Sequence, residues 1–444
     1  MKTTPQLSKL ESILELAKKS GASEAEVIQK KYTKNPVSFE NNKLKSLESN
    51  ESSGIAIRLI KNNRVGISSS TDPDALESIA LSAIEASEFG PDATFEFTKE
   101  KLNPEKENKL PELPLENLVE KGTKIIDSLK IFHKDLLISG GFDLSASETI
   151  YLNTNNVFGK RSKSIFSTGF YGNLVRGEDF LGIYESKDSL ENFPDEVKIK
   201  NTLLEKLNYS KDIVQINTKK YPVVFSPHAV LSIFISILGV TLNGKVIQQG
   251  ISPLVDMLGK ELFDKKLILT EDPERGTKIA AFDDEGIKTQ KKDLIKNGVI
   301  NSFYFDLSSG SRVMPQHDST GNGLKPSLSS APSPSLTNLI VQNGNTKNTY
   351  KDIIKNMKEG ILVDQVLGAG QSNTLAGEFN VGIELGFKIE NGEIKGRIKN
   401  CMVAGNIFEV LKNITEISSD QEWVYGSNLL PGFLIDNLTI GAKQ

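Results

Sequence analysis

The sequence is poor in the residues that bind transition metals. Among 444 residues there is one cysteine, Cys401, and there are three histidines: His133, His228 and His317. A single cysteine excludes a disulfide scaffold and any zinc or iron–sulfur site built from several thiolates. No two histidines stand one helical turn apart, as an HExxH zinc hydrolase requires. The sequence therefore predicts neither a metal ligand nor a catalytic residue in this chain.

The sequence also lacks an excess of positive charge and an apolar segment of membrane-spanning length. Lysine and arginine number 53 and aspartate and glutamate 57, for a net charge of −4, which argues against a dedicated nucleic-acid-binding protein. The most apolar stretch, 229–242, has about fourteen residues, too few to cross a bilayer. The N-terminal residues have leucines at helical spacing instead of an apolar signal core. We therefore expect a cytoplasmic protein that binds neither nucleic acid nor membranes.

Residues 1–90 are predicted to form an α+β domain. Apolar residues at helical spacing from Leu7 to Ala17 predict one helix, and a second is expected over 74–88. Between them, alternating segments predict antiparallel strands over 26–33, 37–47, 54–60 and 64–70, and residues 61–63 are typical of a hairpin turn. The order helix, strands, helix indicates two packed layers. Residues 91–114, rich in Pro, Lys, Glu and Asn, are expected to be a linker.

The rest of the chain is predicted to form two further domains. In a middle α+β domain, 115–215, a helix is expected over 115–133, strands over 136–152 and 157–175, and another helix within 188–209. The C-terminal domain, 221–442, begins with a buried strand, 221–225, and an apolar helix that ends near 242. Many short β-like runs follow, with an Asn391-Gly392 hairpin signal and helices near 350–359 and 407–413. The predicted class is α+β, with helix–antiparallel sheet–helix layers and a β-rich, barrel-like or sandwich C-terminal domain.

The local sequences around His317 and His228 indicate different roles for the two histidines. His317 and Asp318 lie in a polar, turn-rich loop, where a histidine beside an aspartate could act as a general base. The alternative is an exposed histidine without a chemical role, because no nucleophile or second ligand is visible nearby. His228 follows Ser226-Pro227 and is interpreted as a residue at a helix start rather than as a ligand.

Other motifs also have structural explanations. Cys401 is followed by apolar residues in an expected strand, which favours a buried structural thiol over a nucleophile. The segment 283–286 (Asp-Asp-Glu-Gly) could suggest a calcium or magnesium site, but without EF-hand spacing an acidic turn is the better interpretation. The glycine pairs lack the strand–GxGxxG–helix context of a dinucleotide site.

A series of short blocks in the second half resembles the TldD/PmbA family, also called modulator-of-DNA-gyrase proteins. Their order and spacing match the family pattern, and the N-terminal unit fits it too. The blocks are 282–286 (FDDEG), 294–299 (LIKNGV), 319–323 (STGNG), 334–339 (PSLTNL), 376–380 (AGEFN), 389–394 (IENGEI) and 403–406 (VAGN), followed by Val410-Leu411 and Asp420.

The resemblance implies one of two kinds of subunit. One kind carries an HExxxH motif on the helix after the short buried strand and a late cysteine, which bind the catalytic zinc. The other kind, PmbA or TldE, lacks them and pairs with the first. Here the corresponding helix reads LSIFISILGVTLNG, and the segment 423–437 contains no cysteine. Because Cys401 lies well upstream, it does not take the ligand's place, and the chain resembles the PmbA/TldE type.

We therefore expect a non-catalytic subunit without a cofactor of its own, with zinc in an HExxxH-bearing TldD-type partner. The resemblance implies proteolysis of small or unfolded peptides by the complex. Alternatives are a stand-alone peptide-binding or assembly protein and a metal-independent hydrolase that uses the loop of His317 and Asp318. A homodimer of the chain is also possible. Gly377, Glu378 and Phe379, in a glycine-rich strand, are candidates for binding a peptide backbone or a partner. The same glycine pattern is also typical of a barrel strand.

Overall fold

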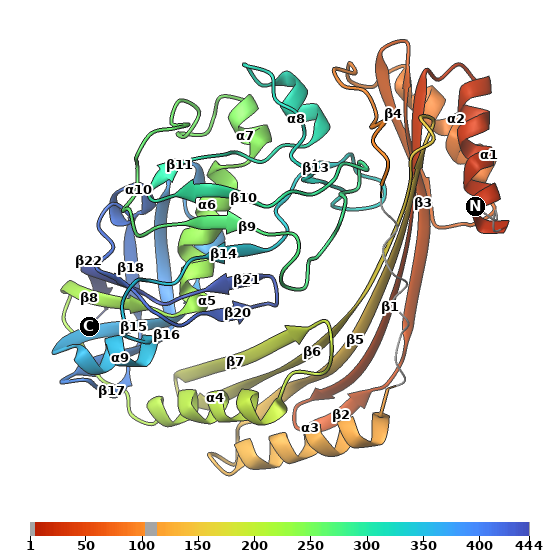
Figure 1. The fold of residues 1–444 in the computed structure, drawn as a ribbon. Coiled ribbons are helices and arrows are strands. Elements are labelled where there is room, and N and C mark those ends of the chain that lie inside the picture. The colour runs from red at the N-terminus through yellow and green to blue at the C-terminus, as the bar shows by residue number, and fades with distance from the viewer. Residues whose placement is uncertain (1–4, 103–112, 444) are drawn as a thin grey trace.

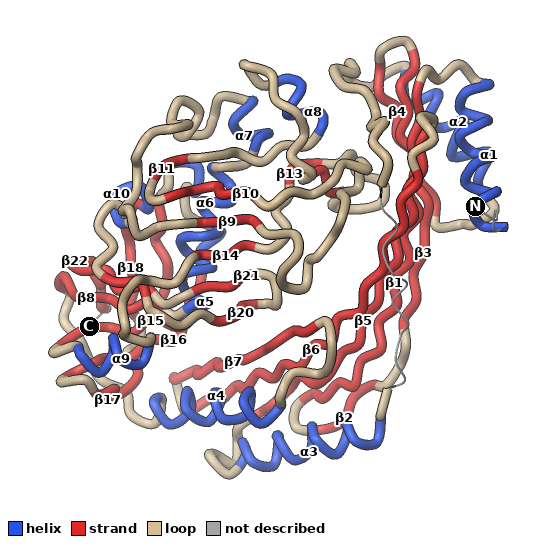
Figure 2. Tube along the Cα trace, viewed as in Figure 1, coloured by secondary structure: helices blue, strands red, loops and turns tan. Residues whose placement is uncertain are grey.

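The computed structural model describes residues 5–102 and 113–443. It consists of a long, curved antiparallel sheet, formed by the first half of the chain, and a β-rich C-terminal domain that packs against the concave side of the sheet (Figure 1). Figure 2 shows helices on the convex side of the sheet, at both of its ends. The predicted α+β class with a barrel-like C-terminal domain is confirmed.

The long sheet has the strand order β4-β3-β1-β5-β6-β7, with β2 paired to β1. The strands are β1 (Glu24–Glu40), β2 (Lys43–Ser46), β3 (Asn50–Lys61), β4 (Arg64–Ser70), β5 (Leu137–Asn153), β6 (Phe158–Arg176) and β7 (Asp179–Ser189). Strand β1 pairs with β5 from Glu26 opposite Asn153 to Phe39 opposite Gly140. The predicted segments 1–90 and 115–215 therefore share this one sheet.

Two predicted hairpin turns are confirmed. Asn62 and Asn63, between β3 and β4, have φ angles of 50° and 60°. Asn391 and Gly392, between β16 (Glu378–Glu390) and β17 (Glu393–Arg397), have φ angles of 51° and 77°. A two-residue type I′ turn needs positive φ at both central positions, and asparagine and glycine adopt it at the lowest cost.

Helices α1 (Pro5–Lys19) and α2 (Leu76–Ser87) cover one end of the long sheet, and α3 (Leu115–Lys130) and α4 (Glu196–Tyr209) cover the other. Their apolar residues form two separate cores with the sheet, one around Ile13, Val27 and Ile57 and one around Leu118, Phe142 and Leu203. Each helix matches a predicted one, with ends that differ by a few residues.

The C-terminal domain contains a closed five-stranded barrel with the order β15-β8-β22-β18-β16, in which β16 pairs back to β15. Strands β17 and β19 extend it, and a six-stranded sheet, β11-β10-β9-β14-β21-β20, and a small sheet, β12-β13, lie beside it. The barrel strands and β19 are β8 (Lys219–Phe225), β15 (Glu359–Leu367), β18 (Cys401–Asn406), β19 (Glu416–Ile417) and β22 (Phe433–Ala442). The others are β9 (Leu269–Glu271), β10 (Lys292–Lys296), β11 (Val299–Ile300), β12 (Gly323–Leu324), β13 (Ser333–Pro334), β14 (Leu339–Val341), β20 (Glu422–Val424) and β21 (Asn428–Leu430).

The predicted apolar helix near 226–242 is confirmed and lies between the barrel and the six-stranded sheet (Figure 1). It consists of α5 (Pro227–Val230), a π-helical turn (Leu231–Ile235) and α6 (Ser236–Thr241). Phe234 packs against Phe225, Phe379 and Phe433 at centroid distances of 5.0 to 5.9 Å. The remaining helices are α7 (Gly244–Gln248), α8 (Leu307–Arg312), α9 (Tyr350–Asn356) and α10 (Ile407–Val410), with short 3-10 turns at Ala369–Gln371 and Thr374–Ala376. Helices α9 and α10 are shorter than predicted.

The acidic segment 283–286 joins the two parts of the molecule. It forms a turn, as predicted, but Asp283, Asp284 and Glu285 are at most 1% exposed, which a solvated acidic turn would not be. Asp284 forms ion pairs with Lys30 and Arg161 of the long sheet. Three backbone N–H groups, of Glu285, Ile287 and Gly323, donate to Asp283. Buried carboxylates need such partners, so these acids serve as an internal joint and are already satisfied without a metal ion.

The predicted linker contributes to the same joint. Arg58, which is 4% exposed, donates to Glu26 Oε1 and to Glu285 Oε1, both at 2.7 Å. Phe95 and Phe97 stack on its guanidinium at 5.1 and 5.0 Å. Residues 91–102 therefore pack on the sheet, whereas 103–112 lie outside the described residues.

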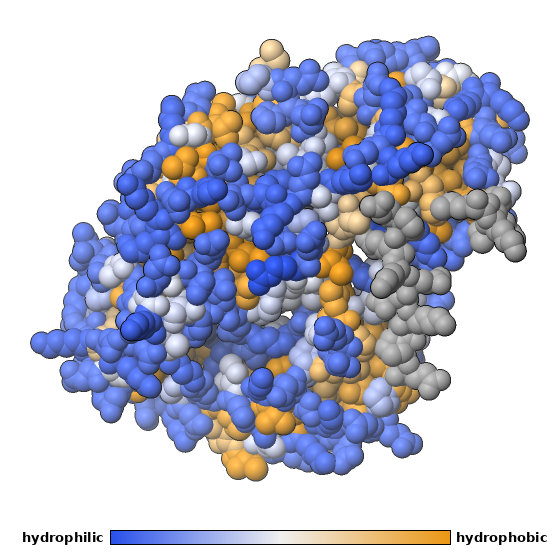
Figure 3. All heavy atoms as spheres, in the orientation of Figure 1, coloured by the Kyte–Doolittle hydropathy of each residue, from blue (hydrophilic) through white to orange (hydrophobic). Residues whose placement is uncertain are grey.

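The outer surface is mostly hydrophilic, and Figure 3 shows it hollowed between the C-terminal domain and the long sheet. Within the described residues, no helix has both the length and the apolar character to cross a membrane.

Candidate functional site

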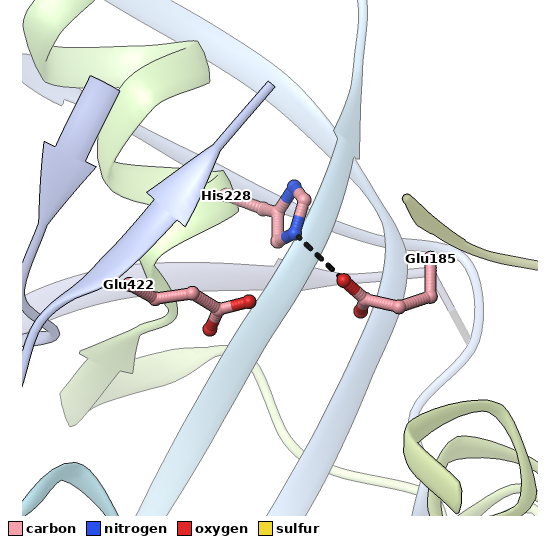
Figure 4. A group of neighbouring side chains, drawn as sticks. All are labelled: Glu185, His228 and Glu422. Atoms are coloured by element: carbon pink, nitrogen blue, oxygen red, sulfur yellow. Dashed lines mark ion pairs between the residues drawn. The ribbon is translucent and has the colours of Figure 1, made fainter. Parts of the chain in front are cut away.

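A buried cluster of charged side chains lies where the edge of the long sheet meets the C-terminal domain. Glu185 comes from β7, His228 from α5 and Glu422 from β20, and Figure 4 shows the three side chains directed toward one another. Within the described residues it is the single group of three histidine, cysteine or acidic side chains whose ligand atoms all lie within 4.8 Å of one another. Glu185 and His228 are 2% and 4% exposed.

Local structure positions the first two of these side chains. Strand β7 is the edge strand, so Tyr184 and Glu185, which project from opposite faces, both reach His228 around the edge. The Ser226 hydroxyl accepts a hydrogen bond from the Ala229 N–H, and Pro227 occupies the first turn. Both features are typical of a helix start, and they hold His228 in the first turn of α5, as predicted.

Two lysines neutralise the carboxylates of the cluster. Lys187 Nζ lies 3.1 Å from Glu185 Oε1 and also contacts Glu422 Oε1. Lys206 Nζ lies 3.3 Å from Glu185 Oε2 and 3.1 Å from Asp364 Oδ2. Burial by itself would raise the pKa of Glu185, but His228, Lys206 and Lys187 together hold it well below its usual range. Glu185 is therefore ionised at neutral pH.

The imidazole of His228 is held mainly by aromatic contacts. Its ring packs edge-on against Tyr184 and Tyr425, whose hydroxyl groups share a hydrogen bond of 2.7 Å. Nδ1 lies 3.4 Å from the Tyr184 hydroxyl. Nε2 has no hydrogen-bond partner among the described residues, and it lies 3.9 Å from Glu185 Oε1, beyond hydrogen-bonding distance. One buried nitrogen is thus directed at a carboxylate without a direct bond.

The donor set of the cluster is suitable for a transition metal, but Lys187 opposes binding. Catalytic zinc sites have three protein ligands, and both imidazole nitrogen and carboxylate oxygen can serve as such ligands. The ammonium group of Lys187, however, contacts both carboxylates, and a cation would have to displace it. In the conformation observed, the residues present do not fit a bound divalent metal.

The structure places His317 and Asp318 apart from any candidate chemistry. Both side chains are exposed, and the imidazole stacks on Phe305 at a centroid distance of 5.2 Å. This arrangement agrees with the predicted alternative, an exposed histidine in a turn-rich loop.

The strand that contains Gly377, Glu378 and Phe379 belongs to the barrel. Gly377 precedes β16 with a φ of 76°, and Phe379 is 2% exposed in the core. Strand β16 pairs with β18 over residues 378–383 and with β15 over 382–390. Most of the backbone of β16 is therefore hydrogen-bonded within the barrel, which favours the interpretation of the glycine pattern as that of a barrel strand. Among the three candidate residues, Glu378 has the exposed side chain.

Cys401 is a structural thiol, as predicted. It is 4% exposed in β18, its Sγ donates to the Lys399 carbonyl oxygen at 3.2 Å, and burial raises the pKa of the thiol to about 11. A thiol that stays protonated is a poor nucleophile.

We therefore expect Cys401→Ser to lower the free energy of unfolding by about 1 kcal/mol, because a hydroxyl is more costly to bury than a thiol. It should leave the activity of any complex unchanged. Urea unfolding and peptide cleavage by the complex measure the two effects. Lost activity at unchanged stability would contradict a structural role.

No pattern in the sequence marks Glu185, Lys187 or Glu422 as site residues. Strand β7 has no counterpart among the predicted segments, because its polar residues and its position after a short turn at Gly177 give it a weak apolar pattern. The ligand atoms come from positions 185, 228 and 422, and no local spacing connects such distant positions. The one available signal was a histidine at a helix start.

Comparison with known proteins gives the family. The model of the PmbA/TldA metallopeptidase C-terminal domain matches residues 218–442, and that of PmbA/TldA metallopeptidase domain 1 matches residues 25–87. The chain belongs to the PmbA/TldA metallopeptidase family. This confirms the resemblance to TldD/PmbA proteins drawn from the sequence blocks.

Several proteins are similar to this chain in sequence or in fold. The uncharacterized protein MJ0231 of Methanocaldococcus jannaschii is 26% identical over 93% of this chain and 95% of its own length. Metalloprotease PmbA of Escherichia coli O157:H7 is 27% identical over 49% of this chain, a match that spans 46% of that protein. The crystal structure of TldE from Thermococcus kodakarensis has the same fold, with a TM-score of 0.86 at 24% identity, covering 98% of this chain and 100% of that one. His228 and Glu422 lie within the matched C-terminal domain, and Glu185 lies outside both matched segments.

Proposed function

We propose that this chain is the non-catalytic subunit of a PmbA/TldA-type metallopeptidase complex. In this proposal an HExxxH-bearing, TldD-type subunit supplies zinc and cleaves small or unfolded peptides in the cytoplasm. When bound there, zinc activates the water that attacks the peptide bond. The present chain covers the partner's active site and helps to hold the substrate.

One observation carries the proposal: beyond His228, the helix that follows β8 has no side chains that could bind zinc. Between Ala229 and Leu242 its polar side chains are hydroxyl groups, of Ser232, Ser236 and Thr241, and each donates a hydrogen bond to a carbonyl oxygen of its own helix. Phe234 and Leu238 of this helix are fully buried in the core. This part of the helix therefore cannot hold the metal ion that the family's name implies. In the proposal, the groups that catalyse hydrolysis come from another chain.

Peptide cleavage is expected only when this chain is mixed with an HExxxH-bearing relative. The chain alone has no zinc-binding helix, and the partner alone lacks the surface that completes the substrate site. A labelled unfolded peptide is incubated with each subunit and with the mixture, and products are quantified by mass spectrometry. The matched control is the mixture with the partner's HExxxH histidines replaced by alanine.

Cleavage by the mixture that is abolished by a chelator supports the proposal. Chelator-insensitive cleavage by this chain alone, lost in His317→Ala, would overturn it in favour of a histidine-dependent hydrolase. Peptide binding by the chain alone, with no cleavage in any mixture, would identify a stand-alone binding protein.

A further inference from the structure

A cavity of about 300 Å³ lies on the concave face of the long sheet, between three of its strands and loops of the C-terminal domain. None of its lining residues belongs to the Glu185–His228–Glu422 cluster. The residues that carry the argument are four cations, Lys30, Arg161, Lys163 and Lys278, and two hydroxyl side chains, Ser147 and Thr149. No acidic side chain lines it, in the part of the chain that the structure describes.

Strand register brings these groups together from distant parts of the sequence. Lys30 of β1 lies opposite Thr149 of β5, which lies opposite Arg161 of β6. One row further along, Ser147 lies opposite Lys163. Residues directly opposite in antiparallel strands project from the same face, so the sheet presents a polar, cationic surface to the C-terminal domain.

The cations that line the cavity differ in their partners. Asp284, behind the cavity wall, forms ion pairs with both Lys30 and Arg161. Lys163 Nζ donates to the Thr277 carbonyl oxygen at 3.2 Å. Lys278 forms no ion pair with any described residue; the surrounding protein excludes water and lowers its pKa, an effect that the charge of Glu271 opposes. Asp284 is thus shared by Lys30 and Arg161, and Lys278 is a cation of the lining that has no ion pair with any described residue.

The other residues that line the cavity favour an anion with an apolar body over a phosphate group. Ile279, Ala280 and Leu324 form an apolar part of the wall, which suits a ligand with a hydrocarbon body beside its charge. The lining segments are strands and loops, whereas phosphate sites typically use a helix N-terminus or a glycine-rich loop. Arg161, which could bind phosphate through two parallel hydrogen bonds, is already engaged by Asp284.

We propose that this cavity binds the C-terminal carboxylate of a peptide whose last side chain is apolar, with Lys278 as the principal counter-charge. The inference rests on the proposed function, since it names the end of the peptide substrate that this chain holds. A free carboxylate pairs with the ammonium group, and the last side chain contacts Ile279 and Leu324.

The test compares two forms of one unfolded peptide that ends in leucine, the free acid and the C-terminal amide. Binding to the full chain is measured by fluorescence anisotropy at low ionic strength. The acid is expected to bind about 10-fold more tightly than the amide, the value of one charge-assisted hydrogen bond. Lys278→Met should reduce binding of the acid to the level of the amide. The control Lys265→Met, at a side chain that is 75% exposed, should retain the difference.

Several results would overturn the inference: equal binding of acid and amide, an unchanged preference in Lys278→Met with native circular dichroism, or no peptide binding at all. Displacement of a weakly bound peptide by inorganic phosphate, without a preference for the acid, would assign the cavity to a phosphate ligand and also overturn it. Cleavage by the mixed subunits without any preference for the acid would refute this site and leave the proposed function standing. A preference for the acid without cleavage in any mixture would support this site and refute the proposed function.

Discussion

Replacing Lys187 by methionine is expected to convert the Glu185–His228–Glu422 cluster into a site that retains about one zinc or cobalt ion per chain. The wild-type chain is expected to retain no stoichiometric zinc. In the wild type the ammonium group of Lys187 contacts both carboxylates. Without it Glu422 loses its ion pair and Glu185 keeps only Lys206. The two carboxylates then face each other beside His228 Nε2, which has no hydrogen-bond partner among the described residues. A divalent cation then relieves the repulsion, and affinity should rise by about 100-fold.

Elemental analysis after dialysis against a mild chelator measures the retained metal, and cobalt absorption reports its ligands. Lys187→Arg, which keeps the positive charge, is the matched control and should bind no more metal than the wild type. The double variant Lys187→Met/His228→Ala should lose the new site. Stoichiometric zinc in the wild-type chain that disappears in His228→Ala would show that Lys187 does not block the cluster.

Arg58→Met is expected to lower the free energy of unfolding by about 3 to 5 kcal/mol, the usual cost of leaving a buried charge without its partner. Arg58 is the cation that Glu26 and Glu285 share at the joint between the sheet and the C-terminal domain. Glu285 is fully buried and also accepts a hydrogen bond from the Leu307 N–H at 2.7 Å. Its carboxylate therefore cannot turn to solvent when Arg58 is lost. Urea unfolding measures the change.

The decrease in the free energy of unfolding caused by Arg58→Met should depend on pH. Burial raises the pKa of Glu285 to about 8, even though Arg58 opposes the shift. A carboxyl group with a raised pKa binds its proton more tightly in the folded protein, so its contribution to stability is present below about pH 4.5 and is lost as the pH rises through about 8. Near pH 6 Glu285 keeps its proton and needs no counter-charge, whereas near pH 9 it is ionised and the loss of Arg58 leaves it unpaired. The loss of stability in Arg58→Met should therefore be larger near pH 9 than near pH 6. The exposed lysine variant Lys99→Met, whose partner is Glu96, should be unchanged at both values. An equal deficit at both pH values would show that Glu285 stays ionised throughout.

Local sequence patterns were sufficient for much of the fold. Period-two alternation identified most of the long strands, helical spacing identified α1, α2 and α3, and the Asn62-Asn63 and Asn391-Gly392 turns followed from the conformations that these residues tolerate. The apolar surroundings of Cys401 were enough to predict its burial. Each of these predictions depends on neighbours within about one turn or one strand.

The sequence by itself determined the family, the α+β class and the lack of zinc ligands between residues 229 and 242, because all three are properties of residue order. Only the tertiary structure decided which charges are buried and which side chains meet. It placed the acids of 283–286 inside the joint with Arg58, brought Lys187 between Glu185 and Glu422, and aligned Lys30, Thr149 and Arg161 across three strands. Most of these contacts join residues more than a hundred positions apart, such as Arg58 with Glu285 and Lys187 with Glu422. The burial that gives them their energy exists only once the C-terminal domain packs on the sheet.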